Sequence, residues 1–184
     1  MRECAGHCEE FGKRCCAIRW PWRTRPSQTL SVTTLQSISA DDHDHLVLVA
    51  DEIAEMVLAC TLPKPRWTHE AHLLTCASLV RRQRPVGALR VLRQAIPRYN
   101  EATGVANTPT GGYHDTLTVF YVWAVNGLLT QGCTITQVLH DPSVDRHAAL
   151  RWWDRDTLFS VDAREHWVAP TLAVETDVGP AEPE

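Results

Sequence analysis

The chain has 184 residues, of which 44% are hydrophobic and 22% are charged, and its net charge is -4. This length suits one domain with tails, and the composition is that of a soluble globular protein. A net acidic chain has no general attraction for nucleic acid, so nucleic-acid binding is a minor alternative. No apolar run approaches the roughly 20 residues that a membrane span needs. We therefore expect no membrane association, and a cytoplasmic location.

The two ends of the chain differ in charge from the part between them. Residues 1–38 are basic and rich in cysteine, without the apolar core of a secretory signal. Cys4 and Cys8 flank His7, but their spacing is not that of a zinc knuckle and no second half-site follows. We therefore predict a disordered basic leader. Residues 171–184 carry acidic residues and no base, which predicts a disordered acidic tail.

Residues 39–170 are expected to form a single helical domain. Apolar residues at helical spacing predict a first helix over residues 43–60, and a proline-rich connector follows it. Thr68 is a suitable N-cap for a second helix over residues 69–82. Pro85 then begins a third helix, because proline is tolerated in a first helical turn. The connectors are short, so these neighbours are expected to run antiparallel.

The second half of the domain is also predicted to be helical. After a loop at residues 105–112, a largely apolar helix runs from Tyr113 to Thr130. Shorter helices are expected over residues 137–140, 147–153 and 158–168. Long alternating strand patterns are missing. The sequence therefore predicts an all-α fold, an up-down helical bundle of three to four main helices plus short C-terminal helices.

Two predicted helix starts place histidine beside a carboxylate. The first contains His69, Glu70 and His72, and the second contains His114 and Asp115. Antiparallel packing would bring both starts to the same end of the bundle, with the three imidazoles facing inward. Three protein ligands with an open position are typical of a catalytic metal site. We therefore predict that His69, His72 and His114 bind a divalent transition metal (Zn, Fe or Cu).

Asp115 or Glu70 would orient these imidazoles, or act as a general base on a metal-bound water or a small-molecule substrate. The spacing differs from the His-Glu-x-x-His pattern of metalloproteases, so no peptidase activity follows. Two alternatives remain: a metal-free acid-base site, and a non-catalytic helical interaction or regulatory domain with structural histidines. The sequence leaves the substrate and the oligomeric state open.

Four sequence blocks carry a resemblance to other proteins. They are WTHEAHL at 67–73, RYNEATG at 98–104, GYHDTLT at 112–118 and AREHWV at 163–168. Together they resemble a set of small bacterial helical proteins with no established activity, over about residues 42–172. The resemblance implies that the four blocks belong to one domain, and it supplies no mechanism.

Overall fold

The computed structural model describes residues 40–172, with side chains from residue 45 onward. The predicted leader at 1–38 and most of the predicted tail at 171–184 lie outside the described residues. The described part contains helices and turns but no strand, so the predicted all-α class is confirmed. None of its helices is both long enough and apolar enough to cross a membrane.

The first two helices are α2, which spans Ala40–Leu58, and α3, which spans His69–Ala102. A single 3-10 turn, η2 at Lys64–Arg66, lies in the connector between them. Within α3, Arg84 has φ 61° and ψ 167°, so two helical segments meet there. Pro85 follows, and proline disfavours helical angles in the residue before it. The predicted break between the second and third helices is confirmed.

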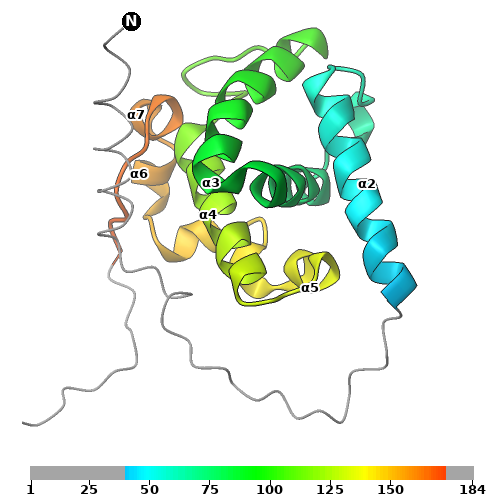
Figure 1. Ribbon diagram of the computed structural model, residues 1–184. Coiled ribbons are helices and arrows are strands. Elements are labelled where there is room, and N and C mark those ends of the chain that lie inside the picture. The colour runs from blue at the N-terminus through cyan, green and yellow to red at the C-terminus, as the bar shows by residue number, and fades with distance from the viewer. Residues whose placement is uncertain (1–39, 173–184) are drawn as a thin grey trace, which may run out of the picture. The chain divides into compact units, whose positions relative to one another are not determined.

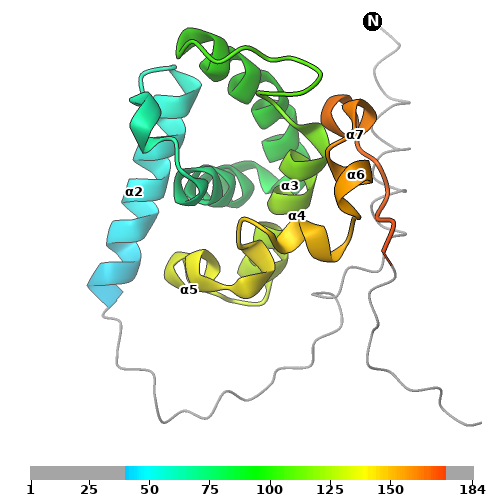
Figure 2. The ribbon, with the colours of Figure 1, turned by 180° about the vertical axis from the view of Figure 1, so that it is seen from behind.

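The bend at Arg84 changes the direction of the chain. Figure 1 shows the first segment of α3 almost end-on, whereas α2 and the second segment of α3 lie close to the plane of the picture. Figure 2 shows the same arrangement from behind. Neighbouring helices are therefore not all antiparallel, and an up-down bundle describes the arrangement only in part. α3 packs against both α2 and α4, the helix at Asp115–Thr130, so its two segments lie at the centre of the fold.

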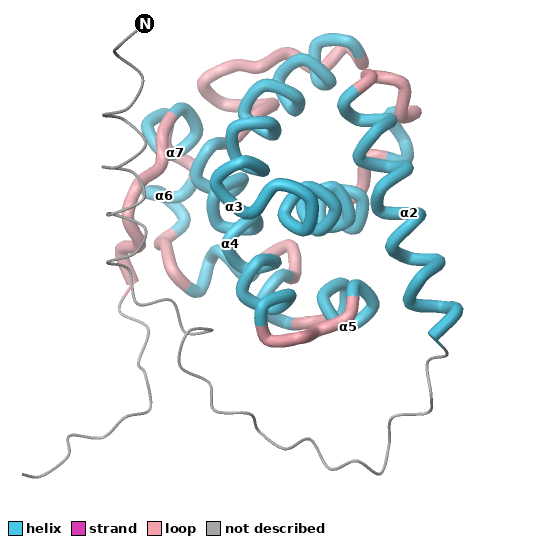
Figure 3. Tube along the Cα trace, in the orientation of Figure 1, coloured by secondary structure: helices cyan, strands magenta, loops and turns pink. Residues whose placement is uncertain are grey.

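Short helices follow α4 in the C-terminal part (Figure 3). They are α5 at Ile135–His140, η3 at Pro142–Val144, η4 at Ala148–Arg151, α6 at Arg155–Leu158 and α7 at Val161–Glu165. One helix is predicted over residues 158–168, but α6 already ends at Leu158 and the separate helix α7 covers only Val161–Glu165. Ser160 causes the division, because it has extended backbone angles and its hydroxyl accepts a hydrogen bond from the Ala163 N–H at the start of α7.

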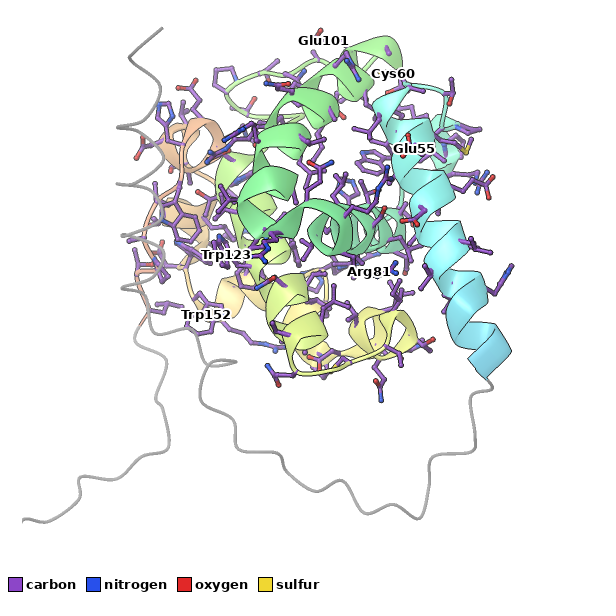
Figure 4. The ribbon with its side chains drawn as sticks, in the orientation of Figure 1. Glu55, Cys60, Arg81, Glu101, Trp123 and Trp152 are labelled. Carbon is purple, nitrogen blue, oxygen red and sulfur yellow. The ribbon has the colours of Figure 1, made fainter. Side chains whose placement is uncertain are left out.

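Trp153 holds the C-terminal helices against α4. It is fully buried, and its ring meets those of Phe120 and Trp167 edge-on, with centroid distances of 5.8 and 5.5 Å. Its indole N–H donates to the carbonyl of Ala169 at 3.0 Å. Figure 4 shows how side chains fill the space between the helices. The short C-terminal elements are therefore part of the core, and they supply backbone groups to the region between α3 and α4.

Candidate functional site

A cavity of about 520 Å³ lies where the start of α3 faces the start of α4. Aromatic, aliphatic and polar side chains line it together, and His69, His72 and His114 are all among them. Helix phase thus brings the three imidazoles to one cavity, although the helices do not form a simple up-down bundle. What each imidazole can do depends on the contacts it already makes.

His69 connects α3 to the C-terminal elements. Thr68 caps the helix by accepting a hydrogen bond from the Ala71 N–H at 3.3 Å, which sets the direction of the first turn. His69 Nε2 donates to the Val144 carbonyl at 2.7 Å. Its ring also meets Tyr121 edge-on, with the centroids 5.1 Å apart. One nitrogen of this imidazole is therefore used to join α3 to η3.

His114 is the buried N-cap of α4. Its Nδ1 accepts from the Leu117 N–H at 3.3 Å, and its Nε2 donates to the Leu158 carbonyl at 2.8 Å. These two bonds together require the neutral tautomer that carries its proton on Nε2. Burial lowers the pKa of His114, which favours the same neutral form. Both nitrogens are therefore engaged by backbone groups.

His72 differs from the other two histidines. It is largely buried, and its ring stacks on Trp67 with centroids 3.7 Å apart and an interplanar angle of 29°. No hydrogen bond joins it to another residue of the described part. Burial, and then the charge of His69, lowers the pKa of His72 to about 4. His72 is therefore a neutral imidazole at pH 7 whose nitrogens are available to a ligand.

The two carboxylates considered for catalysis do not line the cavity. Asp115 accepts hydrogen bonds from Arg93 Nε and Nη2, both at 2.8 Å, and from the Tyr113 hydroxyl at 2.7 Å. Its side chain is only 6% exposed. Glu70 is exposed, and hydrogen bonds from its own N–H and from Thr68 lower its pKa. Asp115 is thus held in a buried ion pair, and Glu70 lies at the surface.

The loop before α4 is organised by Asn107, which the sequence alone did not single out. Its Oδ1 accepts from Asn100 Nδ2 at 2.9 Å and from the Tyr113 N–H at 3.1 Å. Gly112 has φ +78°, and a Cβ there would come within 2.5 Å of the Ala106 carbonyl oxygen. Glycine is therefore required, and the loop returns the chain to α3 just before His114.

Three more lining residues were not expected from the sequence to belong to the site. Trp67 and Tyr121 form aromatic walls, and Arg146 contributes a cation. Trp67 belongs to the same block as His72, so that block was a usable signal. No sequence pattern connects Arg146 with the histidines, because the connection depends on how η3 folds back onto α4.

The described residues include no group of three His, Cys, Asp or Glu side chains arranged to hold a metal ion. Two of the three proposed ligands direct Nε2 at a backbone carbonyl, from His69 to Val144 and from His114 to Leu158. Each could bind a metal through Nε2 only after giving up that bond. The three-histidine centre with Zn, Fe or Cu stays a prediction.

Comparisons of the chain with protein-family models, with curated proteins and with solved structures found no match. The resemblance to small bacterial helical proteins therefore stays a prediction. The fold and the site define an all-α protein with a histidine-lined cavity. Its function has to be inferred from that cavity: a neutral imidazole, aromatic walls and one cationic side chain.

Proposed function

We propose that this chain binds a small organic molecule in the cavity between the starts of α3 and α4. The observation that carries the proposal is His72, a largely buried imidazole in the cavity wall with no hydrogen bond to another described residue. Small-molecule sites are typically concave, roughly 300–1,000 Å³ in volume, mostly apolar and equipped with a few polar groups. The cavity has this size and this character.

His72 supplies the directional contact in this proposal. A neutral imidazole accepts a hydrogen bond at one nitrogen and donates one from the other, so His72 can pair with a hydroxyl or an amide group. Its pKa of about 4 makes it a weak base at pH 7. Hydrogen bonding to a ligand therefore fits His72 better than proton abstraction, and the proposal concerns binding.

The walls supply the remaining binding energy. Ile96 and Leu117 offer aliphatic surface, while Trp67 and Tyr121 offer aromatic surface. Burying apolar area contributes about 25 cal/mol per Å², and aromatic contacts add to it. A molecule with a planar apolar body and one hydrogen-bonding group would therefore match the cavity.

A titration followed by NMR tests the proposal. The protein is labelled in its histidine side chains and titrated with indole and with 2-naphthol, two planar probes that donate hydrogen bonds. We expect a saturable shift of the His72 resonance. Leu117→Trp should fill the cavity and abolish the shift. Leu129→Trp is the matched control, because it lies half-buried on the same helix outside the cavity lining. No shift with either probe, or an equal shift in Leu117→Trp, would reject the proposal.

A metal-dependent enzyme is the second candidate, and the observation that favours it is the common cavity shared by His69, His72 and His114. Metal analysis of protein purified after growth with several metals tests it. Near-stoichiometric metal that is lost in His72→Ala, with helicity retained, would support it, and metal-free protein would reject it. If neither a metal nor a small molecule binds, a non-catalytic interaction or regulatory domain is the remaining hypothesis.

A further inference from the structure

The formal charge in the cavity wall is positive. Among the described residues that line the cavity, Arg146 is the only Arg, Lys, Asp or Glu, so no carboxylate lines it. Asp115 is held by Arg93, and Asp145 pairs with Arg151 at 2.7 Å. The positive charge of Arg146 contributes to lowering the pKa of Glu70, but no ion pair joins the two side chains. The guanidinium of Arg146 is therefore available to a ligand.

The backbone next to Arg146 is fixed by residues of the same cavity. The Tyr121 hydroxyl donates to the Asp145 carbonyl at 2.9 Å, and His69 Nε2 donates to the Val144 carbonyl at 2.7 Å. These two bonds attach the residues just before Arg146 to the cavity wall. The backbone that positions the Arg146 side chain is therefore held at the cavity by hydrogen bonds.

The aromatic walls lie in the same cavity as this cation. Trp67 stacks on His72, and Tyr121 packs against His69. Aromatic side chains favour planar ring systems through offset or edge-on contacts. A guanidinium favours a carboxylate, with which it forms two parallel hydrogen bonds. A single guanidinium balances one negative charge, whereas a phosphate dianion would keep an unbalanced charge.

We propose that the ligand of this cavity is a small aromatic monocarboxylate, with its carboxylate at Arg146 and its ring system between Trp67 and Tyr121. This inference rests on the proposed binding function and specifies its ligand class. His72 lies beside Trp67, so it would contact the ring or a polar substituent of it.

The test compares two probes that share one ring system and nearly the same shape, one of them an anion and the other neutral. 2-Naphthoate and its neutral amide, 2-naphthamide, are titrated into the full-length protein by isothermal calorimetry at low salt. We expect the carboxylate to bind roughly tenfold more tightly than the amide, because a charge-assisted bidentate contact is stronger than a neutral one. Arg146→Gln should remove this difference and leave the binding of the amide unchanged.

Arg81→Gln is the matched control, since Arg81 is exposed on the first segment of α3 (Figure 4) and is not among the residues that line the cavity. The difference between the probes should persist in this variant. Equal binding of carboxylate and amide to the wild-type protein would overturn the inference and leave the proposed binding function intact. Binding of neither probe would overturn both. A preference that survives Arg146→Gln would also overturn the inference.

Discussion

The starts of α3 and α4 have similar sequences and different structures. Each places histidine beside a carboxylate where the helix begins. At the α4 start, His114 uses both ring nitrogens on the backbone, and Asp115 is held by Arg93. At the α3 start, His72 has no hydrogen bond to a described residue, and Glu70 is exposed. At the α4 start, the polar side-chain atoms of His114 and Asp115 all have protein partners, and we call this the closed start. At the α3 start, His72 lines the cavity without such a partner, and we call this the open start.

This difference shows that a histidine-carboxylate pattern does not by itself indicate chemistry. Structural roles account for His114 and Asp115 completely, since every polar atom of their side chains has a hydrogen-bond partner in the protein. Packing does not explain His72 in the same way, because His72 lines the cavity and makes no hydrogen bond to another described residue. Substitutions at the two starts should therefore have different effects, and the following predictions run from the largest to the smallest.

His114→Ala should destabilise the fold by roughly 4 kcal/mol, since it removes the N-cap of α4, leaves the Leu158 carbonyl without its donor and opens a hole in the core. Urea denaturation followed by circular dichroism measures this. His114→Asn should recover part of the loss because asparagine is also a good N-cap. A cost no larger than that of His72→Ala would remove the distinction between the two starts.

Stability should depend on pH through His72. Its pKa is about 4 in the folded chain against an ordinary value of 6.5, so the unfolded chain binds this proton more tightly. The contribution is fully present above pH 6.5, and it falls by up to about 3 kcal/mol as the pH drops through 4. Burial lowers the pKa of His114 too, in the same direction.

The contribution of His72 is isolated by His72→Phe, which keeps an aromatic ring beside Trp67. Urea denaturation at several pH values should show a shallower loss of stability toward acid pH in this variant than in the wild-type protein. Parallel curves for the two proteins between pH 7 and 4 would contradict the assignment of His72 as a buried neutral imidazole.

Asp115→Asn should destabilise the fold by about 2 kcal/mol, because the buried ion pair with Arg93 is lost while part of the hydrogen bonding remains. Arg93 is 37% exposed, so water reduces the cost. The measurement is again urea denaturation, with circular dichroism at pH 7. An unchanged free energy of unfolding would show that the ion pair of Asp115 with Arg93 does not stabilise the α4 start.

Glu70→Gln is the matched change at the α3 start and should alter stability by less than about 0.5 kcal/mol, since Glu70 is exposed. Thermal and urea unfolding at pH 7 are sensitive enough to check this. A loss as large as that in Asp115→Asn would mean that Glu70 takes part in a structural network that its exposure does not suggest.

Much of the architecture could be predicted from the sequence, because it depends on short-range rules. The cap at Thr68 and the break before Pro85 both follow from residues within one turn of each other. The C-terminal part was less predictable. The hydrophobic pattern there predicts one helix over residues 158–168 and does not reveal the cap at Ser160, at which α7 begins separately from α6.

The sequence by itself determined the all-α class, the two histidine-carboxylate helix starts and the inward phase of their imidazoles, since periodicity and capping are local. Only the tertiary structure decided what those imidazoles do. His69 meets Val144, 75 residues away, and His114 meets Leu158, 44 residues away. These pairings, and the position of Arg146, depend on how the C-terminal helices fold back onto α3 and α4. The tertiary structure thereby distinguishes the closed start from the open one.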